Sequence, residues 1–218
     1  MRLSLIITKS LLILSALFGV QAALAQDAGV TAPVAADPNA LDPENTLYLD
    51  LSTGGRVTIR LYQAVAPAHV ERIKTLTRRG FYDGLLFHRV IEGFMAQTGD
   101  PTGTGTGESD LPNLKPEFSA FPHLRGVVSM ARATAEDSAN SQFFICFQPR
   151  FALDNLYTVF GRVTGGMQYV DAIERGEPPA NPDRIVQASI AADNKPAPVF
   201  APKPAMEAPA VTADQLSK

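Results

Sequence analysis

The stretch FHRVIEGFMAQTGD, residues 87–100, sets one arginine among aromatic and aliphatic side chains. If this stretch is a strand, Arg89 shares a face with Phe87 and Ile91, because alternate side chains of a strand point the same way. The stretch holds no Ser or Cys that could act as a nucleophile. Arg89 therefore extends its charge to water, pairs with an Asp or Glu from elsewhere, or serves a chemistry that needs no nucleophile.

Outward from this stretch, the preceding residues predict a β-hairpin and then a helix. Residues 46–51 and 56–61 alternate with period two and flank the turn signal Ser-Thr-Gly-Gly. Pro67 then opens a helical pattern, for which Gly80 is the expected C-terminal stop.

The residues that follow predict more short strands and a second helix. The helical pattern covers residues 167–175 after Gly165-Gly166. About eight strands and two helices in roughly 145 residues are typical of a mainly β domain. A closed antiparallel barrel with helices over its ends fits this pattern, and a sandwich with peripheral helices remains open. The remaining apolar runs are 85–91, 93–97, 127–131, 142–147, 158–163 and 184–191.

The two ends of the chain differ from this central region. Residues 1–25 combine early basic residues, an apolar run and an Ala-x-Ala site, which predicts a cleaved secretory signal peptide. The alternative is a retained anchor, but the apolar run is short for a membrane span. Residues 26–45 read as an Ala/Pro-rich linker, and residues 193–218 as a Pro/Ala-rich disordered tail. The predicted domain is therefore 46–192, exported, and periplasmic if the source is a Gram-negative bacterium.

Composition excludes several classes of function. The formal net charge is −3, and no basic cluster is longer than Arg78-Arg79, so nucleic acid is not an expected partner. Cys146 is the only cysteine, so no intrachain disulfide can form, and its apolar neighbours predict a buried hydrophobe.

No motif for a metal, a cofactor or a hydrolytic nucleophile is present. The three histidines lack metal-ligand spacing, and no GxSxG sequence occurs. The Gly-rich run 99–107 lacks the Lys-Ser/Thr of a phosphate-binding loop, so it is interpreted as a loop with permissive backbone angles. We expect neither a cofactor nor a metal.

Three blocks of sequence resemble one known family. FHRVIEGFMAQTGDPTGTGTG, then GVVSMAR with SQFFICF, then LDNLYTVFGRVTGGM are similar to the signature blocks of the cyclophilin family of peptidyl-prolyl cis-trans isomerases. The resemblance runs in order from about residue 46 to residue 191. It implies the closed eight-stranded antiparallel barrel capped by two helices, rather than the sandwich.

The resemblance also implies a use for the arginine. Rotation about an X-Pro bond breaks no covalent bond, so no nucleophile is needed. By similarity to the family, Arg89 is the catalytic donor to the proline nitrogen, and Gln97 holds this arginine and the substrate carbonyl. The other implied residues bind the proline ring or the flanking peptide: His88, Phe94, Met95, Ala131, Arg132, Gln142, Phe144, Leu153 and Tyr157.

Three rim positions depart from the best-known family members. Arg132 stands in place of an asparagine, Tyr157 in place of a histidine, and a tryptophan position falls at or beside Ala152. Without that indole we expect weak binding of the drug cyclosporin.

The sequence as a whole predicts a prolyl isomerase that assists the folding of exported proteins. Its expected partners are proline-containing peptides and folding exported chains, with no stable membrane insertion after signal cleavage and a monomeric state by default. Two alternatives remain: a non-catalytic chaperone module that binds proline-containing peptides, and an envelope protein whose Pro-rich tail is the working part.

Overall fold

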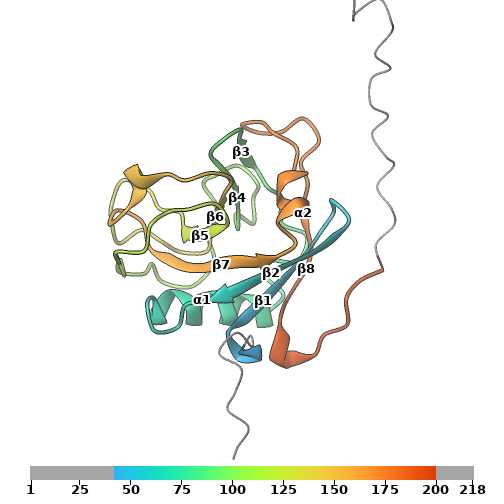
Figure 1. Ribbon diagram of the computed structural model, residues 1–218, viewed down its shortest axis with the longest axis horizontal. Coiled ribbons are helices and arrows are strands. Elements are labelled where there is room, and N and C mark those ends of the chain that lie inside the picture. Colours follow the sequence, from blue (N-terminus) through green and yellow to red (C-terminus); the bar gives the residue numbers. More distant parts are fainter. Residues whose placement is uncertain (1–41, 200–218) are drawn as a thin grey trace, which may run out of the picture. The chain divides into compact units, whose positions relative to one another are not determined.

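The structure of the protein is a computed structural model that describes residues 42–199. Each of the eight predicted strand-like runs overlaps one strand. The strands are β1 (Thr46–Leu51), β2 (Gly55–Leu61), β3 (Arg89–Ile91), β4 (Met95–Thr98), β5 (Val127–Met130), β6 (Phe143–Cys146), β7 (Val159–Gly165) and β8 (Ile185–Ile190). They form one antiparallel sheet in the order β3-β4-β6-β5-β7-β2-β1-β8 (Figure 1).

The prediction of a closed barrel is wrong in one respect. The sheet is an open, strongly curled half-barrel with β3 and β8 at its two edges. The segment that precedes β3 joins the start of β8 through the isolated bridge Leu86–Arg184 and through backbone hydrogen bonds from the amides of Gly84, Phe87 and Ile185. Val90 of β3 bridges Gly176, which lies outside β8.

The predicted hairpin is confirmed by β1 and β2. Leu47 pairs with Ile59 and Leu49 with Val57, and all four side chains are buried. A Cβ atom at Gly55 would fall 2.1 Å from the ring of Tyr169, so a larger residue where this hairpin meets the second helix would require that ring to move.

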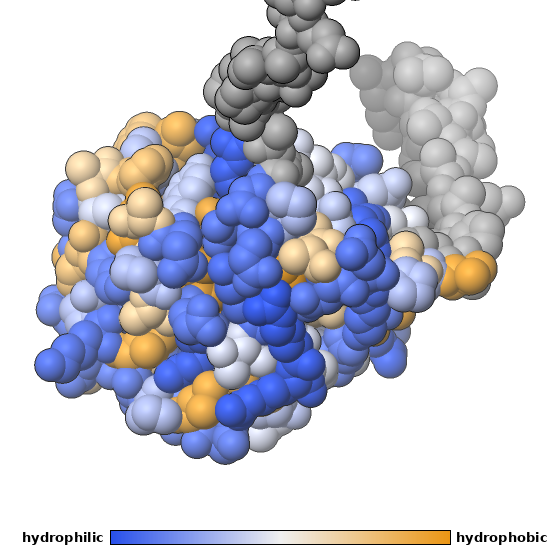
Figure 2. Space-filling model, turned by 90° about the horizontal axis from the view of Figure 1, so that it is seen from below, coloured by the Kyte–Doolittle hydropathy of each residue, from blue (hydrophilic) through white to orange (hydrophobic). Residues whose placement is uncertain are grey.

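The first helix begins and ends close to where its sequence predicts. Helix α1 spans Pro67–Arg78, and Gly80 takes the left-handed conformation (φ +70°) that ends it. Val70 and Ile73 are fully buried. Figure 2 views the molecule from the side on which α1 lies in Figure 1 and shows mostly hydrophilic residues there, with small separate hydrophobic patches.

The second helix is shorter than predicted. Helix α2 spans Met167–Asp171 and ends four residues before Arg175. The Arg175 guanidinium donates to the carbonyls of Asp171 and Ile173, and the Glu174 amide donates to Asp183. In a longer helix these backbone carbonyls and this amide would hydrogen-bond within the helix. Here side chains bind them instead, and the helix ends.

The stretch around Arg89 is only partly a strand. Phe87 is fully buried in the main core together with Val90, whereas Ile91 packs on a separate apolar cluster. The predicted sharing of one face by Phe87, Arg89 and Ile91 is therefore wrong. The regular strand begins only at Arg89, because the Phe87 amide donates to the Asp183 carbonyl outside the ladder.

The separate apolar cluster is the part of the fold that forms the site. It is built on Met95, Phe144 and Cys146, with Ile91, Phe94, Ala131, Leu153 and Tyr157 packed against it. Cys146 is fully buried, as predicted, and burial raises the pKa of its thiol to about 12. This thiol is consequently a packing group rather than a reactive one.

The ends of the described region are tied together. Two short 3-10 helices, η1 (Pro43–Asn45) and η3 (Ala191–Asp193), are joined by Arg78, which binds Glu44 and Asp193. The predicted signal peptide, most of the linker and the tail from residue 200 lie outside the described residues. None of the helices within residues 42–199 is long and apolar enough to cross a membrane.

Candidate functional site

An apolar pocket of about 320 Å³ lies over the separate cluster. Strand β4 contributes Met95 and Gln97, β6 contributes Phe144, and the 3-10 helix η2 (Phe151–Leu153) contributes Leu153. Nine of the eleven predicted site residues line it together, from six separate segments: Arg89, Phe94, Met95, Gln97, Ala131, Arg132, Phe144, Leu153 and Tyr157.

Three aromatic rings form a row along this pocket. The Phe144 ring lies 6.4 Å from that of Phe94 and 5.9 Å from that of Tyr157, measured between centroids. Met95 is buried beside them. An apolar ring of proline size would find hydrocarbon contacts on several sides here.

Arg89 stands at the edge of this apolar pocket and is held from two directions. Its Nε donates to Glu177 Oε2 at 2.7 Å, and its Nη1 lies 3.5 Å from Gln97 Oε1. Arg89 and Gln97 are also direct partners in the pairing of β3 with β4. The Arg89 side chain is 42% exposed, so its other N–H groups can reach a bound peptide.

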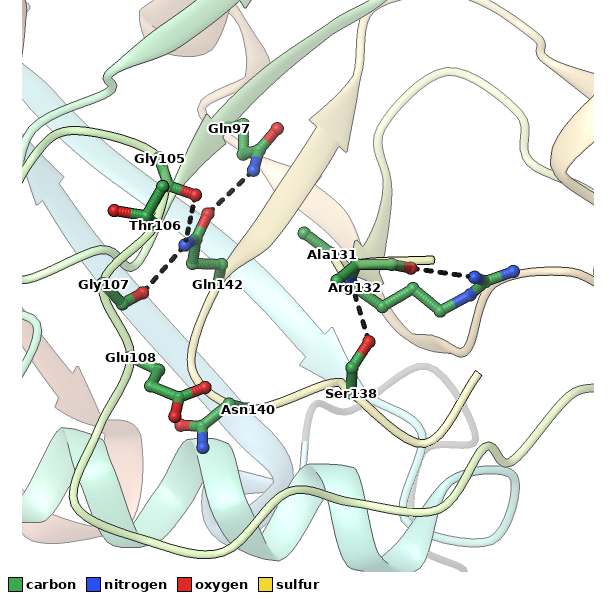
Figure 3. A pocket seen from close by; sticks show the side chains of 11 residues that line it. Gln97, Gly105, Thr106, Gly107, Glu108, Ala131, Arg132, Ser138, Asn140 and Gln142 are labelled. Carbon is green, nitrogen blue, oxygen red and sulfur yellow. Dashed lines mark hydrogen bonds between the residues drawn. The ribbon is translucent and has the colours of Figure 1, made fainter. Parts of the chain in front are cut away.

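A chain of amides fixes which atom of Gln97 faces Arg89. Gln142 Nε2 donates to the carbonyls of Gly105 and Gly107, which leaves its Oε1 to accept from Gln97 Nε2 at 2.8 Å (Figure 3). Gln97 Oε1 must then point toward Arg89. The two carbonyls therefore set the orientation of both amides.

Gln142 lines a second pocket, also of about 320 Å³, rather than the apolar one. The two pockets share Gln97, Ala131 and Arg132, so they are neighbours separated by these side chains. Figure 3 shows this second pocket between the Gly105–Gly107 loop and the loop that carries Ser138.

His88 lines neither pocket. It is buried beside Gly105, and burial lowers the pKa of its imidazole, so the ring is neutral near pH 7. The structure therefore places His88 behind the loop that borders the groove.

The Gly-rich loop is organised around a carboxylate of its own. The Asp100 side chain accepts hydrogen bonds from the Thr102 amide and hydroxyl and from the Gly105 amide. A side chain at Gly107 would fall 2.0 Å from Asp100 Oδ1, so the loop closes tightly on this group. The backbone amides of this loop thus donate to Asp100, whereas in a phosphate-binding loop they would donate to the ligand.

His123 supports the pocket from behind, a role that its sequence context did not indicate. It is fully buried, and its ring stacks on Phe144 with centroids 6.3 Å apart and planes 17° apart. Its Nδ1 lies 2.8 Å from Asp154 and its Nε2 lies 3.1 Å from Ser129 Oγ. These contacts hold the stacked pair against β5 and η2.

Glu177 is the second residue that sequence analysis missed. It lies in a Pro-rich loop with no periodic signal, and only the fold brings it to Arg89. Among residues 42–199, no group of three or more His, Cys, Asp or Glu side chains could hold a metal ion.

Comparisons with known proteins agree with this fold and show its family. The model of the family "Cyclophilin type peptidyl-prolyl cis-trans isomerase/CLD" matches residues 48–190. The chain belongs to this family, as its sequence motifs predicted.

One similar relative is a probable peptidyl-prolyl cis-trans isomerase of Brucella suis, 45% identical over 194 residues, which cover 81% of this chain and 98% of the relative. Among solved structures, cyclophilin AquaCyp293 from Hirschia baltica is similar, with a TM-score of 0.66 and 31% identity over 72% of this chain and 77% of that one. A Cryptosporidium parvum cyclophilin, solved in the presence of the dipeptide Ala-Pro, has a TM-score of 0.63 and 26% identity over 66% of this chain and 98% of that one.

Proposed function

We propose that this isomerase seats the proline of an X-Pro segment in the apolar pocket, with Arg89 as the catalytic donor, and that its clients are exported proteins during folding. The observation that carries the proposal is Arg89, held by Glu177 and Gln97 at the edge of a pocket lined mostly by aromatic and aliphatic side chains. The export part rests on residues 1–25, whose pattern is that of a signal peptide. Periplasmic location follows if the source is Gram-negative.

The chemistry needs only a better fit to the twisted amide than to either planar form. The barrier of about 18–20 kcal/mol is the loss of amide resonance as the C–N bond rotates. In the twisted state the proline nitrogen regains a lone pair. A guanidinium N–H aimed at that nitrogen donates more strongly there than to a planar amide, and so lowers the barrier.

The remaining side chains would position the substrate. Phe94, Met95, Phe144 and Leu153 would contact the proline ring, and their low polarity would strengthen the hydrogen bond from Arg89. Gln97 would keep the guanidinium in place and bind the peptide carbonyl. Ala131 and Tyr157 would border the flanking backbone.

The decisive experiment compares the unmodified protein with Arg89→Ala and Arg89→Lys. Cis/trans exchange of an X-Pro peptide is measured by NMR exchange spectroscopy, and circular dichroism checks that each variant is folded. We expect Arg89→Ala to lose most of the activity, and Arg89→Lys to recover only part, since an ammonium lacks the rigid fork of donors. Unchanged exchange with folded Arg89→Ala would refute the mechanism.

Two other functions are separated by further assays. If the protein only binds proline-containing segments, Arg89→Ala should still assist refolding of a client whose folding is limited by X-Pro isomerisation. If the Pro-rich tail is the working part, deletion of residues 200–218, which keeps η3 and its ion pair with Arg78, should leave isomerase activity intact and abolish partner recovery.

A further inference from the structure

Two arginines beside the apolar pocket lie on aromatic rings instead of carboxylates. The Arg132 guanidinium lies 4.8 Å from the centre of the Tyr157 ring, and that of Arg150 lies 4.7 Å from the centre of the Phe94 ring. Phe144 contacts both rings, so the two cations stand at opposite ends of the aromatic row. Within residues 42–199, neither arginine takes part in an ion pair.

Arg132 is held in one position without losing its charge. It donates to the carbonyl of Leu156 through Nε and Nη2, at 3.2 and 3.1 Å, and through Nη1 to the carbonyls of Ala133 and Thr134, at 3.0 and 3.1 Å. All of these acceptors are uncharged. A cation already fixed in this way would lose little side-chain entropy when a ligand binds.

The charges around the apolar pocket are unbalanced. Its lining contains Arg89 and Arg132 but no carboxylate. Two carboxylates that support the site are already engaged: Glu177 binds Arg89, and Asp154 binds His123. Glu108 lines the second pocket and forms no ion pair with any described residue.

We propose that this isomerase prefers substrates with Asp or Glu within about two residues of the proline, and that Arg132 and Arg150 set this preference. The inference rests on the proposed function of the apolar pocket. A peptide that seats its proline in that pocket and extends along the aromatic row would bring its neighbouring residues to the two ends of the row. A carboxylate there would meet a positive charge, which at Arg132 is held in place by hydrogen bonds, whereas a lysine side chain would be repelled.

The test uses peptides that differ at one position. One set carries Glu, Gln or Lys directly after the proline, and a second set carries them two residues before it. We expect kcat/KM from NMR exchange to fall in the order Glu, Gln, Lys, with Glu about five to ten times above Lys at low ionic strength for at least one set. The ratio should shrink toward one in 0.5 M salt.

Single substitutions show which arginine causes the preference for Glu over Lys. Arg132→Gln and Arg150→Gln should each lower the Glu-to-Lys ratio in the set that they control, and Arg132→Lys should retain part of it. Lys195→Gln is the control, because it removes an exposed cation from a different pocket that contains no site residue. The Glu-to-Lys ratio of this variant should equal that of the unmodified protein.

The outcomes separate the two proposals. Equal exchange of the Glu and Lys peptides would overturn the acidic preference and leave the isomerase mechanism standing. A ratio that persists in both Gln variants would overturn the assignment to these arginines. No exchange with any peptide would overturn the proposed function, and this inference with it.

Discussion

Glu177 accepts a hydrogen bond from the Nε of Arg89 at 2.7 Å, although the two residues are 88 positions apart in the sequence. The bond uses Nε, the guanidinium nitrogen that is attached to Cδ. It leaves the two terminal nitrogens, Nη1 and Nη2, for Gln97 and a substrate. Glu177 is thus a positioning residue for the proposed donor.

Replacing Glu177 by Gln should weaken catalysis modestly. The pair is half-exposed, and exposed pairs contribute about 0.2–1 kcal/mol, so we expect a two- to fivefold loss of kcat/KM in the peptide exchange assay. High salt should reduce activity of the unmodified protein toward that of the variant. Asp171→Asn, which breaks the exposed pair with Arg125, is the matched control and should change nothing. A Glu177→Gln protein with unaltered kcat/KM would remove this positioning role.

Replacing Gln142 by Leu should disturb both the loop and Gln97. The change removes one acceptor and two donated hydrogen bonds at nearly constant volume, so we expect the free energy of unfolding to fall by about 1 kcal/mol. Turnover should fall severalfold because Gln97 Oε1 is no longer directed at Arg89. Gln142→Glu should be worse, since a carboxylate cannot donate to the two glycine carbonyls. Urea titration measures the stability and the exchange assay measures the turnover. Equal stability and turnover of Gln142→Leu and Gln142→Glu would contradict the proposed chain of amide hydrogen bonds.

Asp100 should make stability fall in acid. Burial alone would raise the pKa of this carboxyl, but hydrogen bonds from Thr102 and from the Gly107 and Gly105 amides outweigh it and lower the pKa to about 2. A lowered folded-state pKa stabilises the protein above the unfolded value near 4, and this contribution, about 2 kcal/mol, is lost as the pH falls from about 4 to 2.

Urea midpoints measured from pH 7 to pH 2 test this. Asp100→Asn should be less stable than the unmodified protein at pH 7 and should lose less of its stability in acid. Asp110→Asn, at an exposed carboxylate, should follow the unmodified curve. Parallel curves for all three proteins would exclude Asp100 as the acid-sensitive group.

Cyclosporin binding should be weak and should improve when an indole is restored. Ala152 is exposed in η2, next to Leu153 of the apolar pocket. We expect Ala152→Trp to tighten binding about tenfold, since it adds a large flat ring and an N–H donor at the rim. Phe151→Trp places the same group one residue away and should not. Calorimetry that gave a nanomolar Kd for the unmodified protein would contradict the prediction.

Much of the site could be predicted from sequence because its residues lie in short, specific blocks. Arg89, Phe94, Met95 and Gln97 are all within nine positions of one another, and the structure places all four in one pocket. His88 and Gln142 were expected in the same groove, but one lies behind the Gly-rich loop and the other in the second pocket. His88 and Arg89 are adjacent in sequence, but the regular strand begins only at Arg89. Outside a regular strand, strict alternation no longer predicts where a side chain lies.

The sequence by itself determined the local elements: the hairpin of β1 and β2, the start and end of α1, and the run that contains each strand. These follow from side-chain periodicity and from Gly and Pro, which act on their immediate neighbours. Only the tertiary structure decided that the sheet stays open, that Glu177 binds Arg89, and that His123 stacks on Phe144. Those contacts join distant segments, and their geometry depends on strand register and on loops that carry no periodic pattern.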